Sequence, residues 1–167
     1  MQKEKDSSTI FGIDPGTRIT GYGIIQWKSP CYRVIDFGSV RPPSHLDSVQ
    51  TYLALFNALD SLLAKYAPDY VVLESQFVYK NVRSAMKLGK AQAVAALAAA
   101  RRGIPVFEYA PKQAKRAVVG NGAASKEQVQ KMLQLLLSLP ALPEPEDAAD
   151  ALALALCHAH TLKFPPR

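Results

Sequence analysis

Two short apolar runs in this chain each end in an acidic residue, and this pattern limits the folds that the chain can adopt. Asp14 closes the run at residues 9–14, and Glu74 closes the run at residues 70–74. Short apolar runs of this kind predict buried strands. The carboxyl ends of such strands are where α/β sheets build their sites. We therefore expect a sheet with two carboxylates at one of its edges.

A second acidic group, Asp147 and Asp150, opens the predicted last helix. A spacing of three residues places both side chains on one helix face. Each acid also has a structural explanation: Asp14 as a turn residue before Pro15, Glu74 as the polar end of a strand, and the two aspartates as partners of the helix dipole. Their joint occurrence is better explained by a shared cation, because clustered carboxylates repel one another when ionised.

The remaining pattern predicts one mixed α/β domain with a central sheet flanked by helices. Strands are expected at residues 9–14, 20–27, 32–40, 70–74 and 105–109. Helices are expected at residues 49–66, 81–102, 112–119, 125–137 and from about residue 147. The first three strands follow one another without a helix, which predicts an antiparallel meander. We expect the domain to span residues 9–162, with a flexible tail at residues 1–8 and a short tail at 163–167.

Composition supports a cytoplasmic protein with one core. The chain has 167 residues, of which 49% are hydrophobic and 20% are charged, as in a single globular domain. No run approaches the roughly 18 apolar residues of a membrane span, and the polar start does not resemble a signal peptide. The two cysteines, Cys31 and Cys157, are expected to be unpaired, partly buried thiols.

Positive charge is concentrated in the middle of the chain. Residues 75–131 carry eleven Lys or Arg against two acids, whereas the segments on either side are weakly acidic. This distribution favours a polyanionic partner such as nucleic acid, although a solvated charged surface has the same signature.

Carboxylates without a Cys or His set favour Mg²⁺ or Mn²⁺ over zinc. Two such ions roughly 4 Å apart can activate water and stabilise the leaving oxygen of a phosphodiester, which makes a nuclease a coherent interpretation. His158 is about 16 Å further along the predicted helix than Asp147, too far to share the metal. We therefore expect His158 and His160 to be structural or exposed.

The ordered motifs resemble the RuvC family of bacterial Holliday-junction resolvases. The first is the run at residues 12–25, Gly-Ile-Asp-Pro-Gly-Thr-Arg-Ile-Thr-Gly-Tyr-Gly-Ile-Ile. The later ones follow in order: residues 74–77, Asn81, Ser84-Ala85, residues 87–89, 111–115, 118–126 and 147–153. Together they span most of the chain from Ile10 to His160. A lone Asp-x-Gly is shared with sugar kinases, but this ordered set is specific.

The resemblance implies an RNase H-like fold with a mixed five-stranded sheet, a homodimer, and Mg²⁺-dependent symmetrical nicking of two opposed strands at a four-way DNA junction. Mn²⁺ is expected to substitute, and the branch-migration proteins RuvA and RuvB are candidate partners. The family's catalytic and metal-binding positions fall on Asp14, Glu74, Asp147 and Asp150. Its DNA-contacting aromatic position falls on Phe77. Its basic positions fall on Lys115 and Lys126, and the neighbouring Lys112 and Arg116 extend that patch.

Structural explanations remain for these DNA-contact residues: Phe77 as a core residue, and each basic residue as a solvated side chain. The family pattern is broken at Gln92 and Ala93, in the long helix where we expect a dimer contact. Three other functions are compatible with parts of the pattern: a non-catalytic junction-binding scaffold, an RNase H-like nuclease acting on RNA or other branched DNA, and an actin-like or sugar-kinase ATPase.

Overall fold

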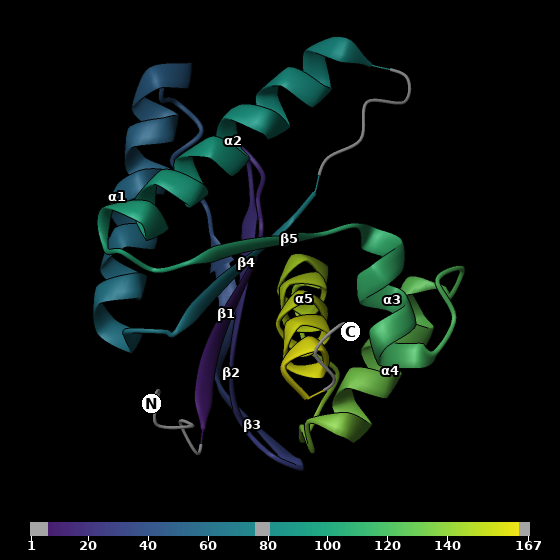
Figure 1. Cartoon of the computed structure of the whole chain (residues 1–167). Helices are drawn as coiled ribbons and strands as arrows, with labels where there is room; N and C mark the ends of the chain where they lie inside the picture. The colour runs from purple at the N-terminus through teal and green to yellow at the C-terminus, as the bar shows by residue number, and fades with distance from the viewer. Residues whose placement is uncertain (1–6, 76–80, 164–167) are drawn as a thin grey trace.

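The computed structural model describes residues 7–75 and 81–163 (Figure 1). Its strands are β1 (Ser8–Asp14), β2 (Thr20–Lys28), β3 (Cys31–Val40), β4 (Tyr70–Glu74) and β5 (Val106–Tyr109). Its helices are α1 (Ser48–Tyr66), α2 (Val82–Arg101), α3 (Pro111–Val119), α4 (Lys126–Leu136) and α5 (Glu146–Lys163). Each strand and helix predicted from the sequence is present, with starts and stops within one residue of the expected ones.

The strands form one mixed sheet in the order β3-β2-β1-β4-β5. β1, β2 and β3 pair antiparallel, which confirms the predicted meander. β4 pairs parallel to β1 and β5 pairs parallel to β4. The carboxyl ends of β1, β4 and β5 therefore meet at one edge of the sheet.

Helices cover both faces of this sheet (Figure 1). α1 and α2 lie on one face, where Phe11 and Ile13 pack against Leu55, Leu59 and the alanines of α2. α5 lies on the other face and is covered in turn by α3 and α4, with Ile10 among the buried side chains. Because side chains alternate along a strand, successive residues of β1 serve two separate cores.

Side-chain caps define where the helices start. The Asp47 carboxylate accepts a hydrogen bond from the backbone N–H of Gln50 at 2.8 Å, at the start of α1. Asn81 caps α2 in the same way, and Ser125 with Gln128 forms the capping box that the sequence predicts for α4.

Within the described ranges, no helix is long and apolar enough to cross a bilayer.

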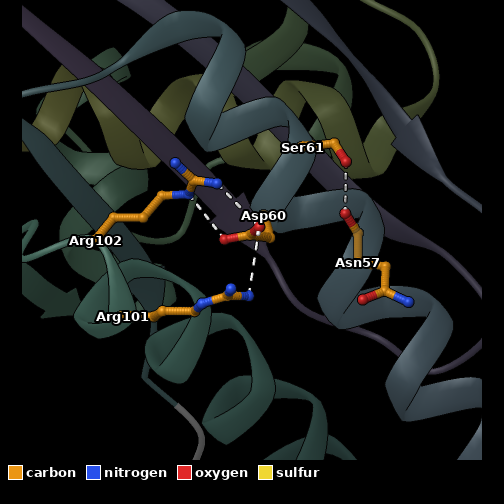
Figure 2. Close-up of polar contacts among 5 residues, drawn as sticks. All are labelled: Asn57, Asp60, Ser61, Arg101 and Arg102. Atoms are coloured by element: carbon orange, nitrogen blue, oxygen red, sulfur yellow. Dashed lines mark hydrogen bonds and ion pairs between the residues drawn. The ribbon is translucent and has the colours of Figure 1, made fainter.

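An ion-pair cluster fastens α1 to the carboxyl end of α2 (Figure 2). Arg102 donates from Nε and Nη2 to the two carboxylate oxygens of Asp60 at 2.8 and 2.9 Å. Arg101 approaches the same carboxylate at 3.7 Å. This two-pronged guanidinium–carboxylate geometry holds the two helices in a defined relative position.

Glycines in β1 and β2 allow α5 to approach the sheet at backbone distance. A Cβ on Gly21 would collide with the carbonyl of Asp147, and one on Gly12 would collide with the carbonyl of Ala151. At Gly23 the added atom would lie 2.7 Å from the backbone nitrogen of Leu152. We name Gly12, Gly21 and Gly23 the glycine seam. It sets both the height of α5 above the sheet and its position along β1.

This contact predicts that Gly21→Ala destabilises the protein, because the new methyl group meets helix backbone, which has no rotamer to change. The expected loss is about 2 kcal/mol or more, seen as a fall of several degrees in the thermal unfolding midpoint. Gly38→Ala is the matched control, because its methyl group meets only the side chain of Tyr22, at 3.0 Å or more. Equal losses in the two variants would contradict the role of the seam.

Candidate active site

The sheet places two of the predicted acids side by side. β1 and β4 are neighbouring parallel strands in which Ile13 pairs with Leu73, so Asp14 and Glu74 end their strands at the same edge. Strand alternation directs both side chains to the face that α5 covers.

The first turn of α5 brings the other two acids to this edge. Asp147 lies over Gly21, and Gly21 pairs with Asp14 in the ladder between β1 and β2. Asp14, Glu74 and Asp147 line one surface hollow of about 600 Å³, which we name the acid hollow. The positive end of the α5 dipole favours carboxylates at this position.

Asp150 faces the opposite side of the same centre. It lines a smaller hollow of about 170 Å³ with Glu74, Lys115 and Lys126. Glu74 borders both hollows, so the four acids form one continuous group. The structure thus brings together all four predicted acids, while their catalytic role stays a prediction.

Burial and mutual repulsion shape the electrostatics of Asp14. Burial raises the pKa of its carboxyl group to about 8, and the charges of Glu74, Asp150 and Asp147 act in the same direction. Lys126 opposes this shift. A bound cation would lower the pKa of Asp14, because a nearby positive charge favours the ionised carboxylate.

Asp150 is held between acids and lysines. Burial raises the pKa of Asp150, Asp147 and Glu146 add to that shift, and Lys126 and Lys115 lower it. Two of the predicted DNA-contacting lysines therefore act directly on the acidic centre.

The predicted basic residues occupy different places. Lys115 in α3 and Lys126 at the start of α4 line the smaller hollow, and Lys126 donates to the Glu146 carboxylate at 2.8 Å. That contact raises the pKa of Lys126. Lys112 and Arg116 are exposed on α3 and border neither hollow. Phe77 lies outside the described residues.

Sequence reasoning missed several residues that border the acid hollow. They are Thr17 and Arg18 after β1 and Ser84 and Lys87 in α2. All four belong to the quoted motifs, which was the available signal. Nothing in the spacing of α2 alone indicates that its amino-terminal half reaches the carboxyl end of β1.

His158 is structural, as predicted. Its ring is 1% exposed and packs against Tyr70 and Phe107, and its Nδ1 lies 2.8 Å from the Tyr109 hydroxyl. Burial lowers its pKa to about 4. His160 packs edge-on against Tyr32. Cys31 is exposed and Cys157 is buried, and each is a free thiol.

Comparison with known proteins identifies the family to which this chain belongs. The model of the family described as crossover junction endodeoxyribonuclease RuvC matches residues 10–158. The chain belongs to the RuvC family. The RuvC of Protochlamydia amoebophila is 55% identical over 150 residues, which cover 90% of this chain and 89% of that protein.

Solved RuvC structures share the fold. The Thermus thermophilus RuvC structure superposes with a TM-score of 0.84 at 32% identity, covering 93% of this chain and 96% of that one. The T. thermophilus RuvC in complex with a Holliday junction substrate gives 0.86 at 29% identity, covering 94% and 96%. The predicted RNase H-like fold is therefore confirmed.

RuvC proteins are metal-dependent nucleases, and the donor set here fits a hard divalent cation in its chemistry. The four acids supply oxygen ligands only. Across residues 7–75 and 81–163, however, no three His, Cys, Asp or Glu side chains stand close enough to hold one ion together. Side-chain rotation of the acids, which line open hollows, would have to complete such a site.

The raised pKa of Asp14 predicts how stability depends on pH. Without divalent metal, the folded protein retains a proton that the unfolded chain releases above about pH 4, so this contribution to stability is lost as pH rises toward 8. Asp14→Asn should therefore stabilise the metal-free protein at pH 7.5, by roughly 1 to 3 kcal/mol. Chemical denaturation in EDTA measures this difference.

The same comparison at pH 4 is the internal control, because Asp14 is then largely protonated in the native protein. The stabilisation should shrink to near zero there. A gain that is equal at both pH values would show that the amide acts through packing and not through charge.

Proposed function

We propose that this chain is an endonuclease that resolves four-way DNA junctions by Mg²⁺-dependent symmetrical nicking of two opposed strands, in homologous recombination and DNA repair. The convergence of Asp14, Glu74, Asp147 and Asp150 from two strands and one helix carries this proposal. Membership of the RuvC family supplies the substrate class. The T. thermophilus relative was solved with a Holliday junction substrate.

The four acids are the proposed metal ligands and Mg²⁺ the proposed metal, with Mn²⁺ as a substitute. Oxygen ligands favour these hard ions. His158 lies near the other end of α5, where its ring packs against Tyr70 and Phe107. Bound divalent cations supply an activated water and charge stabilisation at the departing 3′ oxygen. Asp14 and Glu74 hold their positions through the sheet, while Asp147 and Asp150 hold theirs through the first turn of α5.

Basic residues on α3 and α4 are the proposed DNA contacts of this centre. Lys115 and Lys126 border the acids, so they can meet phosphates next to the cleaved bond. Lys112 and Arg116 extend the positive surface along α3. Phe77 is proposed to stack on an unpaired base of the opened junction.

A homodimer is proposed because two opposed strands require two sites. One face of α2 carries a stripe at helical spacing of Val82, Met86, Ala93 and Leu97, all exposed. Met86 is 60% and Leu97 62% exposed, so the stripe presents its apolar side chains together on one face of α2. Ala93, where the family pattern is broken, lies in this stripe.

Cytoplasmic location and the RuvA and RuvB partners complete the proposal. A junction resolvase acts where chromosomal DNA is. Its junction substrate is moved by branch-migration proteins before cutting, and its nicked products are left for a ligase to seal. Binding to immobilised RuvA and RuvB, with and without junction DNA, tests those partners.

The decisive experiment offers a mobile four-way junction with and without Mg²⁺ and maps the nicks on every strand. Paired nicks at equivalent positions of two opposed strands, only with metal, are expected. Junction binding without nicks would instead indicate a scaffold. Faster cleavage of RNA or of other branched DNA would indicate a different RNase H-like nuclease.

Asp14→Asn should reduce cutting by more than about 100-fold, because it removes a proposed metal ligand. Junction affinity in EDTA should stay within about twofold, since the basic surface is unchanged. Asp69→Asn is the matched control, because it makes the same charge change before β4, at the end opposite Glu74. Normal cutting by Asp14→Asn would overturn the assignment.

Leu97→Asp should convert the dimer to a monomer, because it puts a charge into the apolar stripe of α2. Sedimentation equilibrium at micromolar concentration measures this. Leu135→Asp is the control, because Leu135 is exposed on α4, which lies on the opposite face of the sheet from α2. It should leave the dimer intact. If both variants remain dimeric, the interface lies elsewhere.

A further inference from the structure

A further hollow of about 640 Å³ adjoins the acid hollow on the side away from α3 and α4. Its walls come from the loop after β1, the segment after β3, the start of α1, and Lys87 of α2. Thr17, Arg18, Ile19 and Lys87 border both hollows, so the two are continuous. We name this third hollow the basic groove. The proposed metal ligands do not line it.

Every charged residue among the described residues that line the basic groove is a cation. Arg18, Arg41 and Lys87 are all exposed, and none of the three forms an ion pair with a described residue. No acidic residue is among the described residues that line it. The carboxylate of Asp47, which adjoins the lining in sequence, is committed to the backbone N–H of Gln50.

Neutral donors complete the lining. Thr17, Ser48 and Tyr52 contribute hydroxyl groups. Guanidinium groups form paired hydrogen bonds with phosphate oxygens, and hydroxyl groups add single ones. Arg41 Nε donates to Ser39 Oγ at 3.4 Å, but this leaves its charge unneutralised. In the described part of the chain the groove therefore combines cations that have no ion-pair partner with hydroxyl groups, which suits a phosphodiester backbone.

We propose that the basic groove binds backbone phosphates of the junction on the side of the cleaved bond opposite to Lys115 and Lys126. This inference rests on the nuclease function proposed above. Asp14 and Asp147 face the basic groove through the acid hollow, whereas Asp150 faces the lysines of α3 and α4. The strand to be cut therefore crosses the four acids, with the basic groove on one side of them and Lys115 and Lys126 on the other.

Cationic surfaces on both sides of the acids would offset the repulsion between the carboxylates and the DNA backbone. Four carboxylates repel a phosphate backbone, and cations on one side alone would draw the strand away from the acids. Attraction on both sides instead holds the strand across the acids. The groove thus positions the substrate, and its residues need not touch the reacting atoms.

The test compares Arg41→Gln with Arg33→Gln. Both arginines are exposed and the charge change is the same, but Arg33 lies within β3 and borders none of the three hollows. Junction affinity is measured in EDTA by fluorescence anisotropy from 50 to about 300 mM salt. Arg41→Gln should weaken binding about three- to tenfold and reduce the salt slope by about one for each engaged protomer. Arg33→Gln should change neither.

Hydroxyl-radical footprinting assigns the side. Arg41→Gln and Arg18→Gln should lose backbone protection on one side of the nick only, and Lys115→Gln should lose it on the other side. Unchanged affinity and salt slope for Arg41→Gln, or loss of protection on the Lys115 side, would overturn the groove. Failure of the wild-type protein to bind or nick the junction would overturn the proposed function itself, so the two failures are distinguishable.

Discussion

The backbone contact between α5 and the glycine seam is the constraint on which the site depends. β1 and β4 can deliver Asp14 and Glu74 to one edge of the sheet by strand pairing alone. They cannot deliver Asp147 and Asp150, which belong to a helix more than 70 residues further along the chain. The seam fixes that helix at a height where its first turn meets the strand ends. Because protein interiors are packed as densely as crystals, this backbone contact leaves α5 little room to shift relative to the sheet.

Packing brings the four acids together, but their electrostatic repulsion opposes this arrangement. Burial and three neighbouring acids disfavour ionised Asp14, and Lys126 compensates only in part. Lys126 is itself shared with Glu146, outside the acid group. Without metal, burial and this repulsion raise the pKa of Asp14 and keep its proton at neutral pH, and nearby cations, whether metal ions or lysines, favour the ionised form. This is how a small fold can be built for function at some cost in stability.

The sequence was sufficient to predict the elements and to predict that the four acids lie near one another. Starts and stops were predictable because they carry local signals, such as Asn81 and Ser125 at helix starts and the apolar run that ends at Asp14 in β1. Lys87 was visible in a motif but not as a neighbour of the acids, because that contact depends on how α2 crosses the sheet. The close approach at Gly21 was equally hidden, since a glycine in a strand does not reveal which element will press on it. Such contacts are set by tertiary packing and have no local signature.

One helix, α2, faces two ways within a single turn. Met86 belongs to the exposed apolar stripe, and the next residue, Lys87, borders both the acid hollow and the basic groove. The carboxyl end of α2 is fastened to α1 through Asp60 (Figure 2). In a dimer built on that stripe, a tilt of α2 about its fastened end would move Lys87 in the same rigid motion. In such a dimer the subunit contact and the proposed strand contact would depend on the same helix, so a change at one would be felt at the other.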